Sequence, residues 1–133
     1  METLKATNLM VGDWVQFYNE STNKDECARV TSIQDGKFVQ TSDCDVYYHE
    51  DIYKPIYLTK EILEKNGAYH SNNDRLCMCN RTFEYNERWK MWNVGRMIDA
   101  YESPQFDIHL GISYVHEFQH FLKLIGIDKD VKI

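Results

Sequence analysis

The sequence predicts an α+β protein. A small SH3-like β-barrel is expected over residues 1–58, followed over residues 59–133 by a helix, a short antiparallel meander and a C-terminal helix. Three observations lead to this fold. The 133-residue chain is 43% hydrophobic and 14% aromatic, which suits a strand-rich core. Its first half alternates apolar and polar residues between turn residues, and its last apolar residues recur at helical spacing. The second part either packs on the barrel as a separate unit or continues one domain.

Five short strands are expected in the barrel. They cover residues 13–18, 28–33, 37–41, 44–49 and 53–58. In the first strand, Val15 and Phe17 alternate with Trp14 and Gln16, the period of a half-buried strand. The second and third strands flank Asp35-Gly36, a strong hairpin signal. A single helical turn is expected at 49–52, before the last strand.

The second part begins at a predicted helix N-cap. Thr59 precedes a helix over 60–66, and Gly67 is placed to end it. Strands follow at about 75–84, 87–94 and 105–110, and the C-terminal helix runs from Ser113 to a stop at Gly126. Residues 131–133 are expected to add a terminal strand. The expected core combines apolar residues of both parts: Trp14, Val15, Val30, Ile33, Val39, Val46, Ile56, Leu63, Phe118, Leu122 and Ile125.

Net charge and composition limit the function classes. The formal charge of −6 and the pI near 5.3 argue against sequence-blind binding to nucleic acid, which needs clustered Lys and Arg. The start has no secretory signal pattern, and no segment has the length of apolar residues that a membrane helix needs. We therefore expect a soluble protein in the cytoplasm of the cell that makes it, with no cofactor and with four free thiols at Cys27, Cys44, Cys77 and Cys79.

The sharpest motif is His116-Glu117-Phe118-Gln119-His120, a formal match to the zinc-hydrolase pattern His-Glu-x-x-His. In that alternative His116 and His120 hold zinc and Glu117 is the base. Lys123, however, lies between the two histidines in projection, and no third ligand is well placed before Gly126. The prediction is therefore two solvated histidines on an amphipathic helix and no catalytic zinc. Cys77 and Cys79 are expected to alternate on one strand with both sulfurs on the same face, as buried thiols rather than metal ligands.

Two surface patterns suggest partner binding. In the strand over 87–94, Arg88, Lys90 and Trp92 share one face, a basic-aromatic surface that suits an acidic partner or stacked bases. Asp43, Asp45, Glu50 and Asp51 form an acidic edge of the barrel, next to the tyrosines at 47, 48 and 53, and this edge suits a protein partner. The predicted contacts are Arg88, Lys90, Trp92, Tyr47 and Tyr48. No phosphate-binding loop or serine-nucleophile pattern is present in the sequence.

Residues 9–15, 54–63, 114–120 and 126–127 resemble a family of short proteins without an assigned activity from Bacteroidota phages, prophages and mobile elements. Its members have an N-terminal "hIGNwV" strand, a "PIPLTEEIL" helix start and a C-terminal "YVHxLQ" helix. In relatives Gln often stands at the position of Glu117 and Asn at that of His120, which weakens the zinc alternative further.

The resemblance implies a non-catalytic phage or mobile-element protein. We expect it to bind a host protein or ribonucleoprotein stoichiometrically. By analogy, it would inhibit a host defence system, as anti-CRISPR proteins do. A nucleic-acid-binding accessory module that uses the basic-aromatic strand and a His-Glu-x-x-His zinc metallohydrolase are the alternatives.

Overall fold

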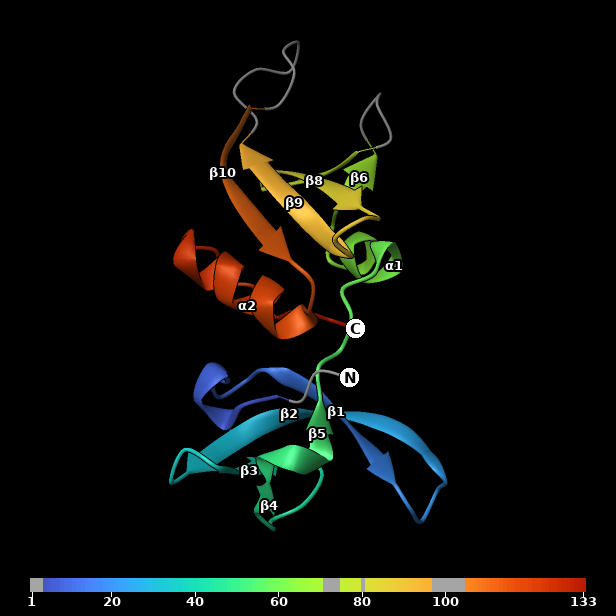
Figure 1. Ribbon diagram of the computed structural model, residues 1–133, viewed down its shortest axis with the longest axis vertical. Coiled ribbons are helices and arrows are strands. Elements are labelled where there is room, and N and C mark those ends of the chain that lie inside the picture. The colour runs from blue at the N-terminus through green and yellow to red at the C-terminus, as the bar shows by residue number, and fades with distance from the viewer. Residues whose placement is uncertain (1–3, 71–74, 80, 97–104) are drawn as a thin grey trace. The chain divides into compact units, whose positions relative to one another are not determined.

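The computed structural model describes residues 4–70, 75–79, 81–96 and 105–133 (Figure 1). It is a small, mostly-β fold with a curled half-barrel sheet, a second sheet and a C-terminal helix. Two compact units divide the chain. Unit 1 comprises residues 1–57 and 114–120, and unit 2 comprises residues 58–113 and 121–133. The C-terminal helix thus contributes its first residues to unit 1 and its last residues to unit 2.

Unit 1 contains the half-barrel sheet. Its strands are β1 (Trp14–Asn19), β2 (Lys24–Gln34), β3 (Phe38–Thr41), β4 (Tyr48–His49) and β5 (Tyr53–Lys54), in the spatial order β4-β3-β2-β1-β5 with antiparallel pairing throughout. Two 3₁₀ turns accompany them, η1 (Ala6–Asn8) and η2 (Glu50–Ile52). The helical turn expected at 49–52 is therefore confirmed as η2.

The β2–β3 hairpin forms where the Asp-Gly pair predicts it. Asp35 and Gly36 both have positive φ, 54° and 65°, and Lys37 N donates to Gln34 O at 3.2 Å. These dihedrals are the left-handed pair that a tight hairpin turn requires, and glycine adopts them without steric cost. Further along the same pair the register shifts between Val30 and Ser32, so that the sheet bends as it curls.

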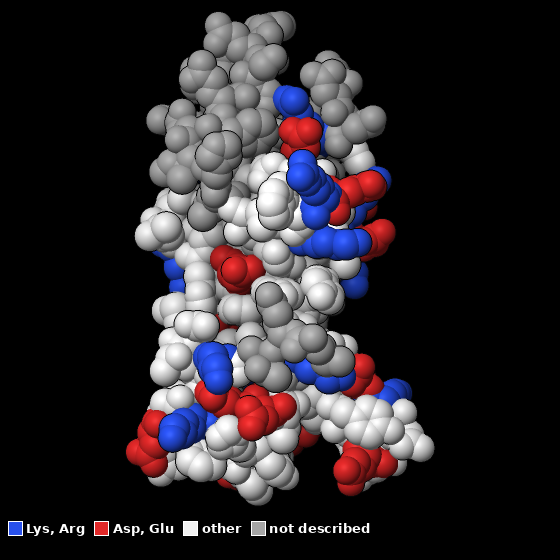
Figure 2. Space-filling view, in the orientation of Figure 1, with Lys and Arg blue, Asp and Glu red and all other residues white. Residues whose placement is uncertain are grey.

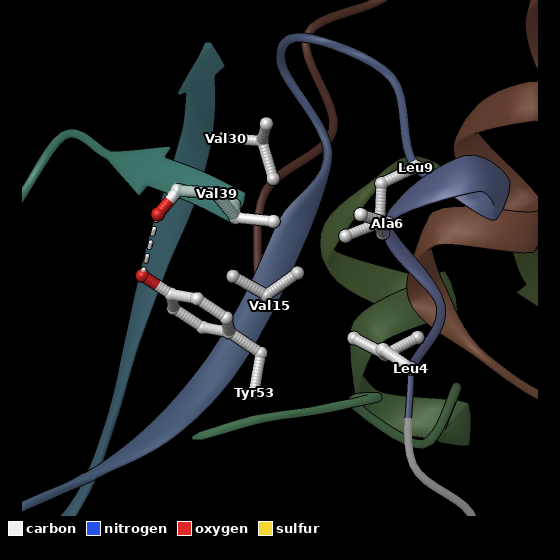
Figure 3. Packing of buried hydrophobic residues seen from close by; sticks show 7 residues of the cluster. All are labelled: Leu4, Ala6, Leu9, Val15, Val30, Val39 and Tyr53. Atoms are coloured by element: carbon white, nitrogen blue, oxygen red, sulfur yellow. Dashed lines mark hydrogen bonds between the residues drawn. The ribbon is translucent and has the colours of Figure 1, made fainter. Parts of the chain in front are cut away.

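The unit 1 core lies inside the curl of the sheet (Figure 3). Its buried members come from the N-terminal segment and from four strands: Leu4, Ala6, Leu9, Val15, Val30, Val39 and Tyr53. The Tyr53 hydroxyl donates to Val39 O at 3.1 Å, which satisfies the polar end of a buried ring. Glu50 is also buried, and its Oε2 accepts a hydrogen bond from Ala6 N at 2.7 Å. This contact fastens the N-terminal segment to η2 and removes Glu50 from the predicted acidic edge.

Unit 2 contains the second five-stranded sheet, an antiparallel meander, and one short helix. Its strands, in the order β10-β9-β8-β7-β6, are β6 (Tyr69–His70), β7 (Leu76–Met78), β8 (Arg81–Asn86), β9 (Met91–Arg96) and β10 (Gln105–Ile112). Helix α1 (Lys60–Lys65) starts where predicted, since the Thr59 hydroxyl accepts from Ile62 N at 3.2 Å. Its last residue is Lys65, and Gly67 beyond it has a φ of 102°, in the left-handed region that stops a helix.

The C-terminal segment of unit 2 is held by one buried asparagine rather than by strand pairing. Asn66 Nδ2 donates to Lys132 O at 2.7 Å, and Lys132 N donates to Asn66 Oδ1 at 2.8 Å. Val131 beside it is buried. The prediction of a terminal strand over 131–133 is therefore wrong. The side-chain amide of Asn66 provides the hydrogen bonds that a neighbouring strand would have supplied.

Helix α2 (Val115–Leu124) is the longest helix among the described residues, and Gly126, with a φ of 81°, stops it as predicted. Ile127 N donates to Leu122 O at 2.8 Å, the hydrogen bond of a glycine-terminated helix. None of the helices in the described ranges has the length and the apolar character to cross a membrane.

The predicted core is confirmed at six of its positions: Val15, Val30, Val39, Leu63, Phe118 and Leu122. Trp14, Ile33, Ile56 and Ile125 are only partly buried. The prediction is wrong at Val46, which has 52% of its surface exposed. Residues 44–47 are irregular with a bend at Asp45, and the predicted strand is reduced to Tyr48–His49.

Candidate functional site

The second histidine of the His-Glu-x-x-His motif pairs with a buried aspartate. His120 Nε2 lies 2.6 Å from Oδ2 of Asp13, whose side chain is fully buried. The same Oδ2 accepts a hydrogen bond from Met10 N at 2.8 Å. A carboxylate therefore already engages His120, which corrects the expectation of a solvated imidazole. Within unit 1 this pair joins α2 to the segment that precedes β1.

His116 is also not solvated, since only 6% of its surface is exposed. Its ring stacks on that of Tyr114, with the ring centres 5.8 Å apart and the planes within 8°. Burial lowers the pKa of His116 below its ordinary value of 6.5, so the ring is neutral at pH 7. Its Nδ1 and Asp13 Oδ1 are buried polar atoms without a hydrogen-bond partner.

The arrangement around these histidines favours a structural role. Glu117, the base in the zinc alternative, accepts a hydrogen bond from Tyr114 N at 3.0 Å and so caps the start of α2. A hollow of about 420 Å³ lies beside it, between the two histidines and residues 7–10. In the part of the chain that the structure describes, no group of three or more His, Cys, Asp or Glu side chains is placed to hold a metal ion.

Gln119 completes the attachment of α2 within unit 1. Its Oε1 accepts from Trp14 N at 2.9 Å, and its Nε2 donates to Gly12 O at 2.9 Å. Two of the stretches that carry the family resemblance, residues 9–15 and 114–120, thus contact each other through Gln119 and the Asp13–His120 pair. These contacts give both stretches a structural role, since they hold the start of α2 against the segment that precedes β1.

The two cysteines of Cys77-Met78-Cys79 do not share a face. Cys77 is buried in β7, whereas Cys79 follows the strand with a φ of 52° and is exposed. The predicted strand over 75–84 is in fact two strands, and the turn between them begins at Cys79. Among the remaining cysteines, Cys27 is exposed and Cys44 is partly buried, and all four are free.

The predicted basic-aromatic face is also corrected. Trp92 is only 7% exposed, and its Nε1 donates to Leu58 O at 2.7 Å, so its indole belongs to the unit 2 core. Arg88 and Lys90 lie in the four-residue turn 87–90 between β8 and β9, not on the strand. The exposed indole of this segment is Trp89, at 63%, with the Arg88 guanidinium carbon 5.5 Å from its ring centre. Because residues 87–90 form a turn and β9 begins only at Met91, side chains do not alternate between two faces over the whole of 87–94 as predicted.

Part of the predicted acidic edge borders a pocket of unit 1. Asp43, Tyr48 and Tyr53 line it, whereas Asp45, Glu50 and Asp51 do not. A cavity of about 400 Å³ opens between the end of β1, the end of β3, β4 and η2. We call it the aromatic-acidic pocket, and its walls include aromatic, aliphatic and carboxylate side chains: Phe17, Tyr18, Glu20, Asp43, Tyr48 and Ile52. Tyr53 also lines it and packs edge-on against Phe17, with 6.3 Å between the ring centres.

Local hydrogen bonds hold the walls of this pocket in place. The Tyr18 hydroxyl donates to Asn23 Oδ1 at 2.6 Å across the β1–β2 turn. Hydrogen bonds from Asn19 and Thr22 lower the pKa of Glu26, which keeps this carboxylate charged at the same turn. Burial raises the pKa of Tyr53 to about 12, so its hydroxyl stays a neutral donor.

The predicted contact residues meet this pocket unequally. Tyr48 lines it, whereas the Tyr47 hydroxyl donates to Ser32 Oγ at 2.6 Å outside it. Sequence reasoning missed Phe17, Tyr18, Glu20 and Ile52 as pocket residues. The run Phe17-Tyr18 at the end of an alternating strand was the available signal, since one of two successive strand residues must leave the core face.

Charge separates the two units. Unit 1 contains eleven acidic and five basic residues and so carries the whole formal charge of −6, whereas unit 2 contains ten of each. Figure 2 shows carboxylates spread over the unit 1 surface in that view. The electrostatic environment of the aromatic-acidic pocket is therefore negative.

Comparison with known proteins gives no family for this chain: it matches no protein-family model, no curated protein and no solved structure.

Proposed function

We propose that this protein is a non-catalytic binding protein that recognises a basic segment of a partner protein in the aromatic-acidic pocket of unit 1. The observation that carries the proposal is the composition of one cavity, in which aromatic rings from β1 and β4 stand beside the carboxylates of Glu20 and Asp43. Apolar rings with nearby carboxylates complement the aliphatic stem and the cationic head of Lys or Arg.

A protein segment fits this pocket better than a phosphate-bearing ligand does. Unit 1 has a net charge of −6, and Asp43 and Glu20 would both repel a phosphate. The exposed Tyr18 and Tyr48 beside the pocket are the side-chain type that dominates protein interfaces. A pocket of about 400 Å³ holds one or two side chains, so the rest of the segment lies over the rim.

The strand order β4-β3-β2-β1-β5, with a 3₁₀ turn between β4 and β5, supports an SH3-like assignment of the half-barrel as part of this proposal. The pocket is lined by residues from the end of β1 and the β1–β2 turn, from the segment between β3 and β4, and from η2. Stoichiometric action on a host protein, including an anti-CRISPR role, stays a prediction from the family resemblance.

Calorimetric titration of a short, blocked Arg-Leu-Arg-Leu peptide tests the proposal. We expect saturable binding to the wild type, which weakens about tenfold in the Asp43→Lys variant because a like charge then faces the peptide. The Glu-Leu-Glu-Leu peptide should not bind.

Asp128→Lys is the matched control, because it makes the same change in net charge at an exposed residue of unit 2. Equal weakening in both variants would mean that overall charge, and not the pocket, attracts the peptide. Absence of saturable binding to the folded wild type would refute the proposal.

A further inference from the structure

The tip of the β8–β9 hairpin presents an exposed tryptophan between two cationic residues. Trp89 is the most exposed tryptophan among the described residues, and Arg88 lies against its ring. Lys90 adds a second positive charge, and its backbone has a φ of 55°. An exposed aromatic ring flanked by two cations is an unusual feature for a tight turn, since burial of an indole is strongly favourable.

The conformation of this tip is fixed before any partner binds. Asn86 Oδ1 accepts hydrogen bonds from the backbone N of Arg88 at 3.0 Å and of Trp89 at 3.2 Å. An asparagine that closes a turn in this way reduces the conformational entropy lost on binding. Trp89 and Arg88 are thus held ready for insertion into a complementary pocket.

A complementary pocket needs apolar walls for the indole and carboxylates for the guanidinium. The aromatic-acidic pocket of unit 1 has both, with Tyr18, Tyr48 and Ile52 beside Glu20 and Asp43. The negative charge of unit 1 attracts a tip that carries Arg88 and Lys90.

We propose that the β8–β9 tip of one copy docks into the aromatic-acidic pocket of a second copy, so that the chain self-associates head to tail. This inference rests on the proposed function, because it names this chain's own hairpin as a basic segment that the pocket accepts. Tip and pocket are different surfaces, so each copy in such an assembly offers one free tip or one free pocket to the next, and open chains or closed rings result. One turn in one pocket buries less than a standard interface, so the association is weak and depends on concentration and salt.

Sedimentation velocity with two complementary variants tests this geometry. The tip variant combines Arg88→Glu with Trp89→Ser and keeps the pocket, while the pocket variant combines Glu20→Lys with Asp43→Lys and keeps the tip. We expect the average mass of the wild type to rise with concentration and to fall again in high salt. Each variant alone should remain a monomer, whereas their equimolar mixture should form dimers and nothing larger, because only one tip and one pocket then match.

Three outcomes would overturn the inference: a wild type that stays monomeric at every concentration, variants that still associate alone, or a mixture that stays monomeric. Circular dichroism of each variant first establishes that it is folded. Titration of a single-stranded oligothymidylate into the monomeric wild type separates the other reading of the tip, since Trp89-dependent binding to it would assign the tip to nucleic acid instead.

The proposed function is tested separately on the tip variant, whose pocket is intact. If it binds the Arg-Leu-Arg-Leu peptide while the wild type does not self-associate, the head-to-tail inference fails and the proposed function stands. If the tip variant binds no peptide, the proposed function fails, and the head-to-tail inference that rests on it fails too.

Discussion

Asp13 and His120 are 107 residues apart in the sequence, yet Oδ2 of the first lies 2.6 Å from Nε2 of the second. The aspartate is fully buried, and a backbone N–H of the preceding loop donates to the same oxygen. A buried carboxylate with two partners is stable only while both remain, because a partner left alone must be desolvated without compensation. This pair therefore fixes the position of α2 within unit 1.

Removal of the carboxylate should be strongly destabilising. In Asp13→Ala, both Met10 N and His120 Nε2 lose their acceptor, and we expect the free energy of unfolding to fall by about 2–4 kcal/mol. Urea unfolding followed by circular dichroism measures this change. Lys123→Ala on the exposed part of α2 is the control and should change stability by less than about 0.5 kcal/mol. A similar loss in both variants would argue against a specific role for the pair.

Gln119 should be sensitive even to an isosteric change. The Gln119→Glu substitution removes the side-chain N–H group that donates to Gly12 O. It also adds a buried carboxylate to unit 1, which already contains the buried carboxylate of Asp13. We expect a loss of about 1–3 kcal/mol in the free energy of unfolding at pH 7, which partly recovers at low pH as the new carboxyl is protonated. Thermal unfolding of the variant and the wild type, at pH 7 and at low pH, measures the effect. Unchanged stability at pH 7 would contradict the attachment that we assign to Gln119.

Stability should decrease as the pH falls below about 6.5, because burial lowers the pKa of His116 in the folded protein. Between the unfolded and the folded pKa, the unfolded chain binds a proton that the folded chain does not, which favours unfolding. One such proton changes the free energy of unfolding by at most about 1.4 kcal/mol per pH unit. Denaturant unfolding at pH 7.5 and pH 5.5 measures the slope.

His116→Phe isolates this effect, since it keeps an aromatic ring against Tyr114 and cannot titrate. The groups that remain in this region are Asp13, Glu117 and His120. We expect a smaller loss of stability on acidification in the variant than in the wild type. An equal loss in both proteins would assign the pH dependence to other groups.

The two tryptophans of the β8–β9 hairpin should respond in opposite ways. Trp92→Phe removes the indole N–H that Leu58 O accepts in the core, and we expect a loss of about 1–3 kcal/mol in the free energy of unfolding. Trp89→Phe changes an exposed ring and should alter stability by less than about 0.5 kcal/mol. Chemical denaturation of both variants decides the matter, and a costly Trp89→Phe with a neutral Trp92→Phe would reverse the assignment of core and surface.

Local signals predicted the parts of the fold that depend on neighbouring residues. The Thr59 cap, the Gly67 stop, the Asp35-Gly36 hairpin and the spacing of α2 all act within a few residues, and each is present where expected. Alternation failed where a turn interrupted it. The turn at 87–90 placed Trp92 in the core and left Trp89 exposed, and the turn that begins at Cys79 separated two cysteines expected on one face.

The site needed tertiary information. No local pattern could show that His120 meets Asp13, because solvated and buried histidines look the same on a helical projection. The acidic edge was visible from Asp43 and Tyr48, but the pocket also needs Tyr18 and Glu20 from the other side of the sheet, and only the curl of the strands brings these segments together.

The most direct test of the central claim is an amide chemical-shift titration of the isotope-labelled protein with the Arg-Leu-Arg-Leu peptide. If the aromatic-acidic pocket is the binding site, saturable shifts should concentrate on the amides of Tyr18, Asp43 and Tyr48 and should disappear in Asp43→Lys. Shifts that leave these three amides unchanged, or that concentrate on the Arg88-Trp89 turn, would contradict the account.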